Sequence, residues 1–154
     1  MKFCLVLMFL ILGRTCFSQA DMASIKNMNL TDGVAIKGYD AVTYFTENKA
    51  VKGNRDIISS YKGIKYCFSS KGDQELFNSN PVKYEPQYGG WCAYAMGSDG
   101  SKVEIDPSTF KILDGKLLLF YNRFFNNTLK SWNADEVKLH RQADENWAKT
   151  TRKK

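Results

Sequence analysis

The stretch Phe110–Tyr121 (FKILDGKLLLFY) holds two apolar runs on either side of Asp114-Gly115. An Asp-Gly pair favours the two-residue turn whose backbone twist matches that of two antiparallel strands. The stretch therefore predicts a β-hairpin with strands at 110–113 and 116–121. It is the strongest strand signal in the chain, and it places a small antiparallel sheet in the second half of the protein.

A second hairpin is predicted from the β-prone runs Ile57–Tyr61 and Ile64–Phe68, which meet at Lys62-Gly63. Glycine takes a positive φ readily at such a turn. A further brief strand is expected at Lys102–Ile105, after a turn at Ser98-Asp99-Gly100.

A short helix is predicted directly after the second hairpin, over Asp73–Asn78. Ser69 or Ser70 can cap it, because a serine side chain accepts a hydrogen bond from an otherwise free N–H of the first turn. Leu76 and Phe77 are expected to face inward from this helix.

The last third of the chain has a helical period of apolar and boundary residues, with lysine and arginine between them. The members of this stripe are Leu129, Trp132, Glu136, His140, Ala143 and Trp147. The predicted fold class is therefore α+β: one small domain of short antiparallel strands and short helices, with an amphipathic helix at its C-terminal end.

Composition limits the class of protein further. At 154 residues, 44% hydrophobic and 14% aromatic, the chain has the length of one domain and the composition of a folded one. The formal charge is +6, and three of the basic residues are Arg152, Lys153 and Lys154 at the very end. A nucleic-acid partner is not expected, because such binding usually needs a clustered basic stripe on a folded face.

The first twenty residues have the layout of a secretory signal peptide: a positive start at Met1-Lys2, an apolar centre at Phe3–Gly13 and small or polar residues at Cys16–Ala20. The apolar centre is shorter than the roughly 20 residues that span a bilayer. We therefore expect an exported protein, periplasmic or secreted, with no transmembrane segment in the mature chain.

Beyond this signal peptide, residues 1–20, the sequence divides into a lead-in segment at 21–37, a domain at 38–148 and a basic tail at 149–154. Without Lys2 and Arg14 the formal charge is +4. The aspartates Asp40, Asp106 and Asp114 are each explained by a turn or a helix cap.

Two cysteines remain after residue 20, Cys67 and Cys92, and they form either one disulfide or two separate buried thiols. Cys92 follows Gly89-Gly90-Trp91, where a tight bend can direct backbone N–H groups at a thiolate. It is the candidate nucleophile and the candidate metal ligand; the alternative is a small buried thiol in an aromatic cluster. A self-contained zinc site is not expected, because His140 is the single histidine and there is no Cys-x-x-Cys.

Four motifs carry a family resemblance: Gly38–Phe45 (GYDAVTYF), Tyr61–Ser69 (YKGIKYCFS), Phe77–Tyr84 (FNSNPVKY) and Tyr88–Tyr94 (YGGWCAY). Together they resemble the YHS domain family, and more narrowly its exported single-domain bacterial branch, over residues 32–148.

The resemblance implies an association with heavy metals, in particular a transition metal such as copper held by cysteines. The metal-linked pattern of the family has cysteines where this chain has Ser69 and Asp73. Cys67 lies on the opposite face of the predicted strand and does not replace them. Cys92 does match the exported branch, which keeps a redox role for this thiol open.

Two functions are compatible with these residues. The first is a non-enzymatic binding module that engages a metal ion, a small ligand or an envelope protein through the surface around Tyr39, Asp40, Tyr88, Gly89, Gly90, Trp91 and Cys92. The alternative is a thiol-dependent redox protein that uses Cys92, with Cys67 as a resolving partner.

Overall fold

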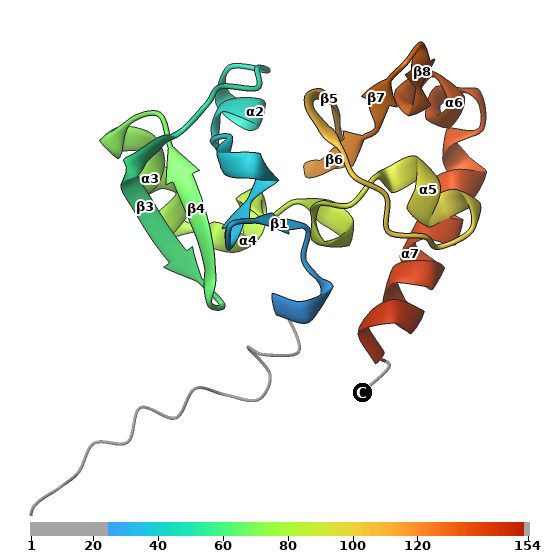
Figure 1. The fold of residues 1–154 in the computed structure, drawn as a ribbon, viewed down its shortest axis with the longest axis horizontal. Helices are drawn as coiled ribbons and strands as arrows, with labels where there is room; N and C mark the ends of the chain where they lie inside the picture. Colours follow the sequence, from blue (N-terminus) through green and yellow to red (C-terminus); the bar gives the residue numbers. More distant parts are fainter. Residues whose placement is uncertain (1–24, 153–154) are drawn as a thin grey trace, which may run out of the picture.

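Short helices and strands follow one another along the chain, in the α+β arrangement that the sequence predicts. The structure is a computed structural model, and it describes residues 25–152. In this range the elements are β1 (Leu30–Thr31), β2 (Val34–Ala35), η1 (Ile36–Gly38), α2 (Thr43–Thr46), β3 (Asn54–Tyr61), β4 (Ile64–Phe68), α3 (Lys71–Ser79), α4 (Pro81–Tyr84), η2 (Gln87–Gly90), α5 (Ala93–Ser98), β5 (Asp106–Leu113), β6 (Lys116–Phe120), β7 (Asn122–Arg123), β8 (Asn126–Asn127), α6 (Thr128–Ala134) and α7 (Glu136–Arg152) (Figure 1).

Both predicted hairpins are confirmed. Strands β3 and β4 pair antiparallel, and β5 and β6 do the same. Their two-residue turns, Lys62-Gly63 and Asp114-Gly115, have positive φ at both positions. This is the turn geometry that the twist of paired strands requires. Strand β4 also pairs with β2, which completes a four-stranded sheet in the order β1-β2-β4-β3.

Strand β6 lies between two apolar cores. Leu117 and Leu119 pack into the larger core, which the first sheet, α3 and α4 share. Leu118 and Phe120 point the other way, into a second core under α5, α6 and α7. Successive side chains of a strand alternate between its two faces, so one buried strand serves both cores. In Figure 1 the β5–β6 hairpin accordingly lies near the middle of the molecule.

The predicted helix after the hairpin is present, but α3 begins at Lys71, two residues before the predicted start at Asp73. Ser70 caps it by accepting a hydrogen bond from the N–H of Asp73. Phe77 is buried as expected, but the prediction that Leu76 also faces inward was wrong, because its side chain is 45% exposed. Consecutive helical residues point about 100° apart, so a short helix that turns Phe77 into the core turns Leu76 away from it.

The C-terminal stripe forms two helices, α6 and α7, rather than one. Asp135 has non-helical dihedral angles, and its N–H bonds to the carbonyl of Trp132 at the end of α6. The break lets Trp132 and Ala143 both enter the second core. Helix α7 crosses α5 closely: a Cβ on Gly97 would lie 2.5 Å from the carbonyl oxygen of Leu139.

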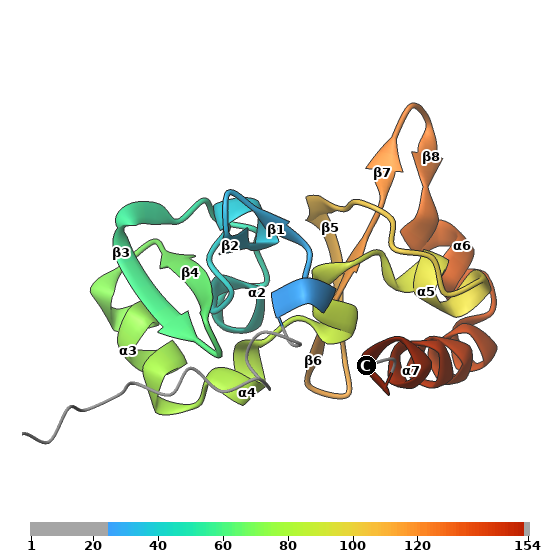
Figure 2. The same ribbon diagram turned by 60° about the horizontal axis from the view of Figure 1, so that its bottom comes forward.

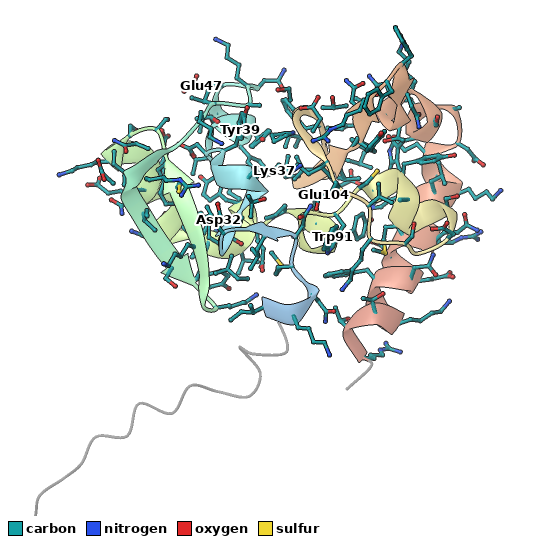
Figure 3. All side chains as sticks on the ribbon, viewed as in Figure 1. Asp32, Lys37, Tyr39, Glu47, Trp91 and Glu104 are labelled. Carbon is teal, nitrogen blue, oxygen red and sulfur yellow. The ribbon has the colours of Figure 1, made fainter. Side chains whose placement is uncertain are left out.

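Residues 102–105 are extended but are not a strand, which corrects the prediction made for them. Their backbone is instead held by isolated contacts, including the N–H of Cys92 bonded to the carbonyl of Val103 at 3.0 Å. Lys37 of η1 forms an ion pair of 2.9 Å with Glu104 and also donates to the carbonyl of Ile105 (Figure 3).

The folded core begins before Gly38, the predicted start of the domain. Val34 and Ala35 are buried, and β2 pairs with β4, so the second half of the predicted lead-in segment belongs to the first sheet. At the other end, residues 149–152 continue α7. The predicted signal peptide, residues 1–20, lies outside the described residues. Within residues 25–152, no helix is both long and apolar enough to cross a membrane.

Candidate functional site

The segment that the sequence singles out for its glycines and aromatic rings forms a tight turn, Gln87–Trp91, which we call the glycine turn. Three successive residues in it have positive φ: Tyr88 at 53°, Gly89 at 62° and Gly90 at 80°. Tyrosine rarely adopts this conformation, and residues held in it occur more often at functional sites than elsewhere.

Residues 27–29 hold the glycine turn in place. The backbone N–H of Asn29 donates to the carbonyl of Gly89 at 2.8 Å, and the Asn29 side chain donates to the carbonyl of Gly90 at 3.1 Å. The indole N–H of Trp91 bonds to the carbonyl of Asn27 at 2.8 Å. The turn is therefore fixed from outside by a segment 60 residues away in the sequence. In Figure 3, Trp91 lies near the middle of the molecule.

Tyr88 points inward from the turn. Its ring is buried, and its hydroxyl donates to Asp144 Oδ1 of α7 at 3.0 Å. Burial raises the pKa of this phenol, and the neighbouring Asp144 carboxylate raises it further. Tyr88 is therefore a neutral hydrogen-bond donor that ties the turn to α7, and its ring meets that of Trp147 edge-on at 6.5 Å.

A hollow of about 500 Å³, here called the Trp147 hollow, opens beside the glycine turn. Its size is within the range of small-molecule sites. Tyr88 and Gly89 come from the turn; Val82, Glu85, Pro86 and Gln87 lead into it; Lys62 and Lys116 come from the two hairpins; and Asn27, Met28, Trp147 and Thr151 complete the wall.

Among residues 25–152, the charged side chains on the wall of the Trp147 hollow are two lysines and one glutamate. Lys62 forms an ion pair with Glu85 at 3.1 Å. Partial burial acts to lower the pKa of Lys62, but the hydrogen bond and charge of Glu85 outweigh it, so the pKa is raised and the amine stays charged. Lys116 is half-buried, and none of the residues described here bonds to its amine. The hollow therefore has one positive charge in excess.

Cys92 lies on the other side of the glycine turn, on the wall of a second hollow of about 330 Å³, the Cys92 hollow. Its thiol is fully buried. The N–H of Tyr121 approaches Sγ at 3.4 Å, and Thr128 Oγ1 also lies 3.4 Å from it. Because Thr128 donates its one hydroxyl proton to the carbonyl of Tyr121, the thiol must be the donor to Thr128. This arrangement satisfies a neutral thiol.

The disulfide that the sequence left open between Cys67 and Cys92 is not formed. Both cysteines are free and buried. Cys67 belongs to β4 and packs against Gly53, because a Cβ added to Gly53 would lie 2.7 Å from the Cβ of Cys67. Burial raises the pKa of the Cys67 thiol. Cys92 is bonded to Tyr121 and Thr128. The two side chains have separate surroundings, which corrects both the disulfide candidate and the role of Cys67 as resolving partner.

Tyr39 and Asp40, the remaining predicted ligand residues, lie at the start of α2 and not at either hollow. Asp40 is fully buried and accepts hydrogen bonds from the N–H of Val42 and from the N–H and hydroxyl of Ser69. Tyr39 lies under the amine of Lys52, 4.7 Å from the ring centre. These contacts make Asp40 a structural link between the start of α2 and the end of β4.

The predicted copper site lacks a suitable donor set. Within residues 25–152, no three of His, Cys, Asp and Glu lie close enough together to hold a metal ion. Ser69 and Asp73, at the positions where the resembled family has cysteines, bond to one another at 3.1 Å. Copper prefers thiolate or imidazole ligands, and neither residue supplies one. Ser69 and Asp73 therefore do not reproduce the cysteine ligands of the resembled family.

Of the described residues that line the Trp147 hollow, Tyr88 and Gly89 were predicted as site residues, and the others, including Lys62, Lys116 and Trp147, were not. Lys62 and Lys116 stand at the two predicted hairpin turns, and Trp147 is the last member of the helical stripe. Their residue types are ordinary for these positions. They come together because β6 and α7 both contact η2 and Lys62 pairs with Glu85 just before it, an arrangement that no single stretch of sequence contains.

The chain matches no protein-family model, no curated protein and no solved structure.

Proposed function

We propose that the protein is a non-enzymatic binding module that takes a small anionic ligand with an apolar ring in the Trp147 hollow. The observation that carries this proposal is Lys116, a half-buried lysine on the wall of the hollow whose amine has no bonded partner among residues 25–152. The resemblance to the exported branch of a family associated with metal-transport proteins supports a binding role.

The wall of the hollow suits such a ligand. Met28, Pro86 and Trp147 offer an apolar surface, and an aromatic ring gains from packing against the indole of Trp147. Lys116 supplies a charge that an anionic group can pair with directly, whereas Lys62 is already paired with Glu85. One free cation beside an apolar wall favours an organic acid over a neutral or cationic ligand.

Catalysis is not the proposed role. Tyr88, whose hydroxyl belongs to the glycine turn, is a neutral phenol bonded to Asp144. Among the described wall residues of the Trp147 hollow, none pairs a nucleophile with a general base.

A fluorescence titration with 1-anilinonaphthalene-8-sulfonate, an aromatic sulfonate, tests the proposal. We expect saturable binding of about one probe per chain, and a Kd about tenfold weaker in Lys116→Glu, which corresponds to about 1.4 kcal/mol. The matched control is Lys71→Glu, an exposed lysine at the start of α3, which leaves the Kd within about twofold. An unchanged Kd in Lys116→Glu, or no saturable binding, would contradict the proposal.

The second candidate is the thiol-dependent redox role of Cys92, which its place on the wall of the Cys92 hollow favours. This role requires the thiol to react in the folded protein. Alkylation of the native chain with iodoacetamide, followed by peptide mass mapping, tests it directly. Rapid modification at Cys92 would support the redox role, and protection until unfolding would leave the cysteine structural.

A further inference from the structure

The β7–β8 hairpin carries two fully exposed aromatic rings at its tip. Phe124 and Phe125 have exposed fractions of 89% and 111%. Figure 2 shows the hairpin projecting from the body of the molecule, away from α7. The tip is separate from both hollows, because neither phenylalanine is among their wall residues.

The turn chemistry of this hairpin is unlike that of the others. Phe124 and Phe125 both have positive φ, at 50° and 65°. Three other two-residue turns of the described chain, Asp32-Gly33, Lys62-Gly63 and Asp114-Gly115, have the same backbone form, and each has glycine in the second position. Asn-Gly or Asp-Gly is the pair that such a turn favours. Two strained aromatic residues whose rings stay in solvent do not stabilise the described fold, which points to a partner outside it.

The stretch of chain that carries the tip has charges of one sign. The stretch Gly115–Ala134 contains Lys116, Arg123 and Lys130 and no acidic residue. Arg123 directly precedes the tip, Lys130 lies in α6 just after the hairpin, and both are exposed. Two aromatic rings flanked by cations match the layered chemistry of an anionic bilayer surface, with apolar chains below negatively charged headgroups.

We propose that Phe124 and Phe125 insert into the interfacial layer of a membrane that contains anionic lipid, with Arg123 and Lys130 at the level of the headgroups. A convex tip suits a bilayer because rings can enter it without a preformed pocket, whereas a protein partner would have to supply one. With only two rings and two nearby cations, the contact is peripheral and reversible.

Vesicle sedimentation tests this proposal on the full chain. The vesicles are of phosphatidylcholine alone, or with about one third phosphatidylglycerol to supply negative charge. The informative variant is Phe124→Asn/Phe125→Gly, which installs the pair that the turn favours and so preserves the hairpin. We expect it to lower the partition coefficient on anionic vesicles about tenfold or more. The control is Val137→Ser, which removes an 87% exposed apolar side chain from α7 and leaves binding unchanged.

The charge is tested separately. Arg123→Gln/Lys130→Gln should weaken binding several-fold on anionic vesicles but not on neutral ones, and added salt should have the same effect on the wild type. Every variant carries the same residues 1–24, so any contribution of that segment to binding is common to all.

A local probe locates the contact whatever the other segments contribute. An environment-sensitive fluorophore is attached at Phe125→Cys in a chain that also carries Cys4→Ser and Cys16→Ser, because Cys67 and Cys92 are buried. Its emission should shift to the blue on anionic vesicles, and the same fluorophore at Glu75→Cys on α3 should not shift. The proposal is overturned by equal sedimentation of the Asn-Gly variant and the wild type, by no shift at position 125, or by a shift that appears without vesicles as the protein concentration rises, which would indicate self-association.

Discussion

Gly89 lies directly against the indole ring of Trp147. A Cβ on Gly89 would stand 2.7 Å from Cη2 of Trp147 and 2.8 Å from the carbonyl oxygen of Asn27. A side chain at position 89 would therefore have to displace Trp147 or the backbone at Asn27. The same close contact places Trp147 on the wall of the hollow. One glycine thus connects a local backbone conformation to the shape of the proposed ligand site.

Gly89→Ala should destabilise the protein by about 2–4 kcal/mol. About 1 kcal/mol comes from a side chain at positive φ, and the remainder from forced movement of Trp147 or of the backbone at Asn27. The control is Gly115→Ala, at a φ of 71° with nothing within 4 Å of its Cβ. It isolates the conformational cost, about 1 kcal/mol. Urea denaturation of both variants measures the difference, and equal losses of stability would contradict the close packing of Gly89.

Asp40 predicts a pH-dependent stability. Burial raises its pKa, against hydrogen bonds from Ser69 and Val42 that lower it. Because the folded pKa lies above the unfolded value of about 3.9, the contribution of Asp40 to the free energy of unfolding is complete below about pH 4 and is lost as the pH rises through the raised pKa. Asp40→Asn removes this titration.

The difference in the free energy of unfolding between the wild type and Asp40→Asn should therefore be largest near about pH 3.5 and smaller near about pH 7. Urea denaturation at the two pH values measures it. At the acidic end we expect a loss of about 1–3 kcal/mol in the variant, from the altered bonds to Ser69. A gap that widens toward neutral pH would show that the folded pKa is lowered instead.

The two thiols should be unreactive in the native protein. Cys67 and Cys92 are both fully buried, and burial raises the pKa of Cys67. Iodoacetamide should modify each only on unfolding, as measured by peptide mapping across a urea series. Cys92→Ala should also cost about 1–3 kcal/mol, because it removes the sulfur that bonds to Tyr121 and Thr128. A peptide that joins Cys67 to Cys92 in the non-reduced map of the native chain would instead demonstrate the disulfide.

The elements predicted correctly from the sequence are those fixed by neighbouring residues. Lys62-Gly63 and Asp114-Gly115 determine their turns locally, and Ser70 caps α3 within one helical turn. The break at Asp135 was missed because each side of it has good helical periodicity, and only the packing of Trp132 and Ala143 in one core shows why two helices form. Residues 102–105 resemble a strand in composition but have no strand partner within the described chain.

The part of the site that was predicted is also the part that neighbouring residues determine. The glycine turn was identified, since paired glycines among aromatic residues indicate a constrained backbone locally. The rest of the predicted surface is divided in the structure: Asp40 links β4 to α2, and Cys92 faces a different hollow from Tyr88. Lys116 and Trp147 reach the Trp147 hollow because β6 and α7 both pack against η2, and these contacts between distant segments cannot be read from a single sequence.

The most direct test of the proposed site is the indole N–H resonance of Trp147, followed by two-dimensional NMR while 1-anilinonaphthalene-8-sulfonate is added. We predict a saturable shift of this resonance and of the backbone N–H of Gly89, with the same Kd as the fluorescence titration, and a weaker Kd in Lys116→Glu. Shifts confined to the Phe124-Phe125 tip or to the Cys92 hollow, with the Trp147 resonance unmoved, would contradict it.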